Sequence, residues 1–164
     1  MERIASFVSK MLEWTVGALF LILAATAFAQ VFFRYGLSSS LVWAHELDIL
    51  LMIWIVWLGA AVGLYRKGHL RITILSDRFS VKVRTILLVL IDVATILFLI
   101  LLGIKGIEVV QSHEGTTLVS MSIPRGFMFA AAPVGAVFMI FLFMPALIED
   151  VKGLFIVQCK GRRN

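Results

Sequence analysis

The chain has 164 residues, of which 61% are hydrophobic, and its mean hydropathy of +1.02 is too apolar for a water-soluble domain of this size. Its formal net charge is +5, which is typical of proteins that bind nucleic acid or an anionic membrane surface. The single cysteine, Cys159, excludes a disulfide within the chain and argues against a thiol-ligated metal site. The composition therefore predicts an integral membrane protein and excludes most soluble functions.

Four long apolar stretches run through the chain: Trp14–Phe33, Val42–Tyr65, Ile86–Gly106 and Phe127–Ile148. Each is close to the roughly 20 residues that an α-helix needs to cross the hydrocarbon core of a bilayer. They predict an all-α integral membrane protein with four transmembrane helices. Because little of the chain remains outside them, we expect residues 1–164 to form a single four-helix membrane domain.

The positive charges are distributed unevenly between the two sides that four crossings would create. Twelve of the fifteen Lys and Arg residues lie in the two tails and in the connection between the second and third stretches. The other side holds Arg34, Lys105 and Arg125. Because short loops rich in Lys and Arg stay in the cytoplasm, we expect both termini to be cytoplasmic. The positive charge then reflects topology and contact with anionic membrane lipids, and nucleic acid is not an expected partner.

Two segments outside the spans have an amphipathic pattern. Residues Met1–Glu13 carry apolar side chains at helical spacing, which predicts an interfacial lead-in to the first span. A second apolar stripe from Ile72 to Ile86 lies beside basic residues, and it favours a short helix in the membrane surface beginning near Ser76. The alternative for this second segment is a strand-like loop, since Ile72–Leu75 is rich in β-branched residues.

Aromatic side chains line one face of the second stretch. Steps of three and four place six residues on this face: Trp43, Glu46, Leu50, Trp54, Trp57 and Ala61. Trp43 suits an interfacial anchor, but Trp54 and Trp57 lie deep in the span. We expect this face to pack against another helix, from this chain or from a partner; exposure to lipid is the alternative.

Isolated polar residues and prolines interrupt the last two stretches. A carboxylate at mid-bilayer costs about 2.5–3.5 kcal/mol, so Asp92 is expected to face protein or to lie close to the cytoplasmic boundary. Lys105 and Glu108, three residues apart, can pair near the outer end. Pro133, beside several small residues, predicts a kink in the last span.

No pattern of catalytic or cofactor-binding residues stands out. The sequence has no phosphate-binding glycine loop, no metal-ligand run and no nucleophile motif, so we expect neither an enzyme nor a bound cofactor. The alternative function is a haem-anchoring four-helix subunit of a respiratory enzyme, since such bundles hold haem between two histidines. Of His45, His69 and His113, only His45 and His113 lie on the same side of the membrane in the expected topology, so only these two could share one haem. Histidines that face water or headgroups are the simpler interpretation.

Several short motifs, taken together in this order, resemble one family. They are Phe33-Arg34-Tyr35, Ser40-Leu41-x-Trp43-x-x-Glu46-Leu47, Trp57-Leu58-Gly59-Ala60-Ala61, Arg66 with Gly68-His69-Leu70, and Ile123-Pro124 ahead of Pro133-x-Gly135. The set resembles the small membrane subunit of tripartite ATP-independent periplasmic (TRAP) transporters. Two departures are His45, where the family often has a second carboxylate, and the region near Thr73, where it often has an aspartate.

The resemblance implies a non-catalytic scaffold subunit in the bacterial inner membrane. In that family a large membrane subunit carries the substrate and sodium sites, and a periplasmic substrate-binding protein delivers the solute. Uptake is driven by an ion gradient, and the substrates are organic acids such as C4-dicarboxylates or sialic acids. The small subunit would bind and stabilise the large one.

The candidate interface or structural positions are Arg34, Tyr35, Trp43, Glu46, Asp48, Trp54, Trp57, Arg66, His69, Asp92, Pro124 and Pro133. Among them, we expect Arg34 to lie near Glu46 or Asp48 at the outer boundary, because a charge pair lowers the free energy of keeping both groups close to lipid. The alternative is that Arg34 extends to lipid headgroups alone.

Overall fold

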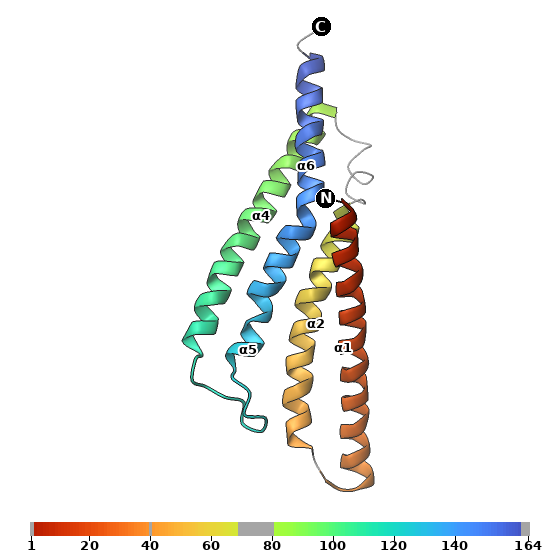
Figure 1. Ribbon diagram of the computed structural model, residues 1–164, viewed down its shortest axis with the longest axis vertical. Coiled ribbons are helices and arrows are strands. Elements are labelled where there is room, and N and C mark those ends of the chain that lie inside the picture. The colour runs from red at the N-terminus through yellow and green to blue at the C-terminus, as the bar shows by residue number, and fades with distance from the viewer. Residues whose placement is uncertain (1, 40, 69–80, 162–164) are drawn as a thin grey trace.

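The four apolar stretches form four long helices. The computed structural model describes residues 2–39, 41–68 and 81–161. Its helices are α1 (Glu2–Gly36), α2 (Val42–Gly68), α4 (Val81–Ser112), the short α5 (Gly126–Phe129) and α6 (Ala131–Gly161) (Figure 1). The segments long and apolar enough to cross a membrane are Arg3–Gly36, Val42–Arg66, Thr85–Ser112 and Gly126–Gly153. The prediction of an all-α fold with four candidate membrane spans is therefore confirmed.

The long helices lie side by side in one layer, in the spatial order α1, α2, α6, α4 (Figure 1). α2 packs against α1 and α6, and α6 packs against α2 and α4, with a smaller contact to α1. In the part of the chain that the structure describes, α4 contacts neither α1 nor α2. Buried residues make up 28% and 33% of the apolar windows of α2 and α6, but 0% and 17% of those of α1 and α4. The layer is thus open, with two flanked inner helices and two outer helices packed on one side.

Successive long helices run in opposite directions, so both chain termini lie toward the same end of the layer (Figure 1). We refer to this end as the terminal end. The opposite end, formed by the α1–α2 connection and residues 113–125, is the loop end.

The outer helices bury a narrow stripe of side chains. In α1 the stripe begins with Ala5, Ser9 and Leu12, which are 2%, 2% and 7% exposed. In α4 it includes Leu88 and Leu99, again separated by steps that keep them on one helical face. A stripe this narrow leaves most of the surface of α1 and α4 available to lipid or to another protein.

The N-terminal segment that was expected as an interfacial lead-in continues directly into α1. Ala5 and Leu12 pack into the hydrophobic core of the layer, and Ser9 is buried between them along the helix. The segment is therefore held against the other helices as part of α1. The second expected surface helix, near Ser76, lies outside the described residues.

Pro133 interrupts the last span close to its start. Proline has no N–H group, so the carbonyl of Phe129 lacks its usual helical partner four residues later. α5 accordingly ends at Phe129, and α6 begins after Ala130. The predicted kink takes the form of a break one turn before the proline. A second proline, Pro145, lies inside α6.

Candidate functional site

The centre of the layer depends on two close contacts made by opposite sides of α6. A Cβ atom added to Gly135 would lie 2.9 Å from the Cβ of Trp57 on α2. A Cβ atom added to Gly106 on α4 would lie 2.9 Å from the Cδ of Pro133. Residues two apart on an α-helix point about 200° apart, so Pro133 and Gly135 face opposite neighbours. The Pro133-x-Gly135 motif therefore brings both α4 and α2 close to α6.

The deep tryptophans of α2 pack on elements of this chain. The ring of Trp54 lies 5.3 Å from that of Phe127 on α5, centroid to centroid. Trp57 contacts α6 at Gly135. Trp43, nearer the start of α2, is 45% exposed and is free to act as an interfacial anchor.

The connection between α4 and α5 folds into a short hairpin. Thr117 pairs with Pro124 in an antiparallel bridge, and the Leu118 N–H group donates to the Ile123 carbonyl at 2.8 Å. Gly115 has a φ of 87°, which a glycine adopts without a steric penalty. The segment buries Leu118 and has a defined backbone.

Glu46 fastens this hairpin to α2. Its two carboxylate oxygens accept hydrogen bonds from the backbone N–H groups of Val119, at 3.1 Å, and Ser120, at 2.9 Å. Hydrogen bonds to an ionised acceptor are roughly twice as strong as neutral ones. Glu46 therefore joins elements that are more than seventy residues apart in the chain, and it does not serve as the counter-ion of Arg34.

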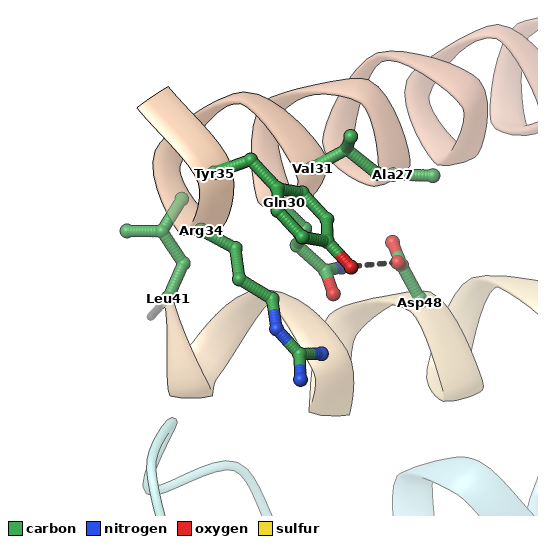
Figure 2. A pocket seen from close by; sticks show the side chains of 7 residues that line it. All are labelled: Ala27, Gln30, Val31, Arg34, Tyr35, Leu41 and Asp48. Atoms are coloured by element: carbon green, nitrogen blue, oxygen red, sulfur yellow. Dashed lines mark hydrogen bonds between the residues drawn. The ribbon is translucent and has the colours of Figure 1, made fainter. Parts of the chain in front are cut away.

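Asp48 is the centre of a polar cluster between α1 and α2. Its carboxylate accepts a hydrogen bond from the Thr26 hydroxyl. It accepts another from the Gln30 side-chain amide (Figure 2). Thr26 and Gln30 lie one helical turn apart, so both face α2. The three side chains are half-buried and satisfy one another. A polar group buried without a hydrogen-bond partner costs roughly 1–3 kcal/mol by mutational data, so these contacts avoid a cost of that kind.

A pocket of about 330 Å³ lies beside this cluster at the loop end. Its lining comes from the last turns of α1 and the start of α2: Ala27, Gln30, Val31, Arg34, Tyr35, Leu41 and Asp48 (Figure 2). The Arg34 guanidinium lies 5.9 Å from the centroid of the Tyr35 ring. Among the described residues Arg34 has no ion-pair partner, although it shares the pocket with Asp48.

Salt bridges lie near both ends of the layer. At the terminal end, Arg66 on α2 pairs with Glu13 on α1 at 2.9 Å, and Ser9 donates a longer hydrogen bond of 3.4 Å to the same carboxylate. Toward the loop end, Lys105 and Glu108 pair at 2.8 Å, as their spacing predicted. Arg66 thus links the two helices of the first hairpin.

Asp92 is fully buried, at 0% exposure. It lies on the same stripe of α4 as Leu88 and Leu99 and takes part in an interaction within the protein. Its side chain therefore faces protein, which is one of the two placements that the sequence allowed.

His45 and His113, the two histidines among the described residues, show no arrangement typical of a cofactor site. The His113 ring packs on Phe129, with a centroid distance of 4.5 Å, and its Nδ1 atom lies 2.9 Å from the Val109 carbonyl oxygen. His45 is exposed, and His69 lies outside the described residues. Within the described ranges no group of three or more His, Cys, Asp or Glu residues could hold a metal ion.

Sequence reasoning missed two features of the loop end. Thr26 and Gln30 were not singled out, although a pair of polar residues four apart in an apolar span is a signal for a polar contact with a neighbouring helix. The hydrogen bonds from the hairpin to Glu46 had no sequence signal, because they involve backbone groups.

A family model described as "Tripartite ATP-independent periplasmic transporters, DctQ component" matches residues 23–153. The sialic acid TRAP transporter small permease protein SiaQ of Vibrio cholerae is 29% identical over 112 residues, which cover 68% of this chain and 65% of that protein. The C4-dicarboxylate TRAP transporter small permease protein DctQ of Rhodobacter capsulatus is 30% identical over 122 residues, covering 73% of this chain and 54% of that protein.

A longer relative is also similar. The sialic acid TRAP transporter permease protein SiaT of Haemophilus influenzae is 27% identical over 146 residues, which cover 89% of this chain but only 24% of that protein. In all three relatives the matched stretch is less than two thirds of the relative's own length.

Proposed function

The chain belongs to the DctQ component family of tripartite ATP-independent periplasmic transporters, and we propose that it acts as the non-catalytic scaffold of such a transporter. The family is a transporter component and not an enzyme, and the chain is a multi-pass membrane protein. In the proposed role, residues 1–164 form a single four-helix membrane domain that binds and stabilises a large membrane subunit.

The family match over residues 23–153 carries this proposal. The relative SiaT supports the choice of partner, because a chain about four times as long contains a stretch similar to this one and bears the name of a permease protein. A small subunit that occurs as part of a larger permease protein is expected to lie against it.

The open layer supports a scaffold role. A chain that transports solute by itself would normally show paired intramembrane charges, broken helices or inverted repeats around a central site. Here α1 and α4 pack on one side only, and large side chains of α1 such as Trp14, Phe28 and Tyr35 are 79%, 78% and 79% exposed. A layer of this kind offers a broad apolar face to another membrane protein. Lipid would cover the part of this face that the partner does not contact.

The transported solute is proposed to be an organic acid, taken up with the energy of an ion gradient. The named substrates of two relatives, sialic acid and C4-dicarboxylate, are both organic acids. A periplasmic substrate-binding protein would deliver the solute to the assembled transporter, and it would meet this subunit only transiently.

We place the protein in the bacterial inner membrane with both termini in the cytoplasm. Twelve of the fifteen Lys and Arg residues lie in the two tails or between the second and third apolar stretches. Positively charged loops of this kind remain on the cytoplasmic side, so the loop end would face the periplasm. Arg34, Lys105 and Arg125 are the Lys and Arg residues on that side.

Isolation of the tagged full chain from its native membrane tests the proposal. We expect a larger membrane protein of the TRAP family to co-purify, and we expect the lone chain, reconstituted in liposomes with an imposed sodium gradient, to accumulate no organic acid. Uptake by the lone chain, or its recovery without a larger membrane partner, would refute the scaffold role. A Soret absorption band in the purified protein would instead support the haem-anchoring alternative, which family membership disfavours.

A further inference from the structure

We propose that the pocket between the end of α1 and the start of α2 binds the headgroup of an aminophospholipid of the phosphatidylethanolamine type. In this site Arg34 binds the phosphate, and Asp48 receives the ammonium group. The proposal concerns a site within this chain and does not depend on the role of the chain as a scaffold.

The position of the pocket suits a lipid headgroup. Its lining residues belong to the part of α1 and α2 next to the α1–α2 connection. Because the chain leaves the apolar spans there, we place the pocket at the boundary between hydrocarbon and water. Its volume of about 330 Å³ lies within the roughly 300–1,000 Å³ that is typical of small-molecule sites. Apolar side chains form part of the wall, including Ala27, Val31 and Leu41, and these can contact the glycerol and the first methylenes of the acyl chains.

The charges of the pocket define the headgroup. Arg34 supplies a guanidinium with no ion-pair partner among the described residues, and guanidinium groups bind phosphate oxygens in a two-pronged geometry. Asp48 supplies a carboxylate on the facing helix, and Thr26 and Gln30 hold it in place. One cation and one anion in the same pocket match a headgroup that carries one of each (Figure 2).

The same charges argue against the other common headgroups. A phosphatidylglycerol headgroup has the phosphate but no cation, so it would leave Asp48 facing a further negative charge. A phosphatidylcholine headgroup has a cation without N–H donors, so it cannot donate hydrogen bonds to the carboxylate. Phosphatidylethanolamine has both a phosphate and an ammonium group with three N–H donors, and it is the one headgroup of the three that complements both residues.

Native mass spectrometry of the full chain in detergent, titrated separately with dioleoyl-phosphatidylethanolamine, -phosphatidylcholine and -phosphatidylglycerol, tests the proposal. We expect tighter retention of the ethanolamine lipid than of either other lipid. Arg34→Gln should weaken its retention about tenfold, since a charge-assisted hydrogen bond is lost, whereas Arg34→Lys should retain part of the binding. Arg125→Gln, which removes a cation at the same end but outside the pocket, is the matched control and should bind as the wild type does.

A second variant tests the anionic half of the site. Asp48→Asn should abolish the preference for the ethanolamine lipid over the choline lipid while Arg34 still binds the phosphate. Unchanged helical content and elution volume would show that the variants fold. Retention by Arg34→Gln equal to that of the wild type, or retention of phosphatidylglycerol as tight as that of phosphatidylethanolamine, would overturn the proposal. Loss of the bound lipid when the chain is isolated with its large partner would also overturn it, because a partner side chain would then fill the pocket.

Discussion

Trp57 of α2 and Gly135 of α6 lie so close together that no side chain fits between their backbones. A Cβ atom on Gly135 would lie 2.9 Å from the Trp57 Cβ and 3.3 Å from the Trp57 carbonyl oxygen. In a bilayer, helix association relies on close packing rather than on hydrophobic exclusion from water, so such a contact has a large influence on which helices become neighbours.

Gly135→Ala is therefore expected to destabilise the α2–α6 pair. The backbone carbonyl cannot move aside as a flexible side chain could, and overpacking of this kind costs about 1–3 kcal/mol. The measurement is the thermal unfolding midpoint of the purified chain in detergent, which should fall. Gly63→Ala is the matched control, because a Cβ on Gly63 would meet no atom within 4 Å. An equal effect of the two substitutions would show that helix propensity, and not the contact with Trp57, governs the result.

Removal of the Glu46 carboxylate should release the α4–α5 hairpin from α2. In Glu46→Ala the N–H groups of Val119 and Ser120 lose their acceptor, and a hydrogen bond to a charged group contributes about 1.5–3 kcal/mol. We expect faster hydrogen–deuterium exchange over residues 117–123, with exchange in the middle of α4 unchanged. Glu114→Ala removes an exposed carboxylate from the same segment and serves as control. Protection of residues 117–123 equal to that of the wild type would contradict the proposed attachment.

The salt bridge between Glu13 and Arg66 should contribute little to stability despite its short distance of 2.9 Å. The Arg66 side chain is 68% exposed and that of Glu13 is 33% exposed, and pairs of this kind contribute about 0.2–1 kcal/mol. A double-mutant cycle with Glu13→Gln and Arg66→Gln, read from thermal unfolding in detergent at low and high salt, is expected to give a small coupling free energy that falls further with salt. A coupling above about 2 kcal/mol would mean that the pair is shielded from water in the folded protein.

The proposed orientation predicts which residues a membrane-impermeant maleimide can reach. Val119 is 84% exposed at the loop end, so Val119→Cys in a Cys159→Ser background should be labelled in spheroplasts. Cys159 in the wild-type chain should be labelled only after the membrane is opened, because the C-terminal tail is expected in the cytoplasm. The opposite pattern would place the loop end in the cytoplasm and would reverse the proposed topology.

Much of the loop end could not have been predicted from the sequence. The spacing of Trp54 and Trp57 indicated a packing face, but it did not indicate whether the neighbour was this chain or another. Arg34 and Asp48 line one pocket without forming an ion pair, whereas Glu46 binds backbone groups of a distant hairpin. Every residue except proline has a backbone N–H group, so the sequence does not indicate which of these groups will donate to a distant carboxylate.

The four long apolar helices and the common end of both tails followed from the sequence alone. Whether a segment prefers lipid or water, and on which side of the membrane a short loop stays, depends on the residues of that segment itself. These properties can therefore be predicted without knowledge of the tertiary contacts. Only the tertiary structure decided that α6 lies between α2 and α4, that α4 touches neither α1 nor α2 among the described residues, and that the helices form an open layer. All four spans are similarly apolar, so the order of neighbours depends on contacts such as Gly135 with Trp57 and Pro133 with Gly106, where shape and not hydropathy discriminates.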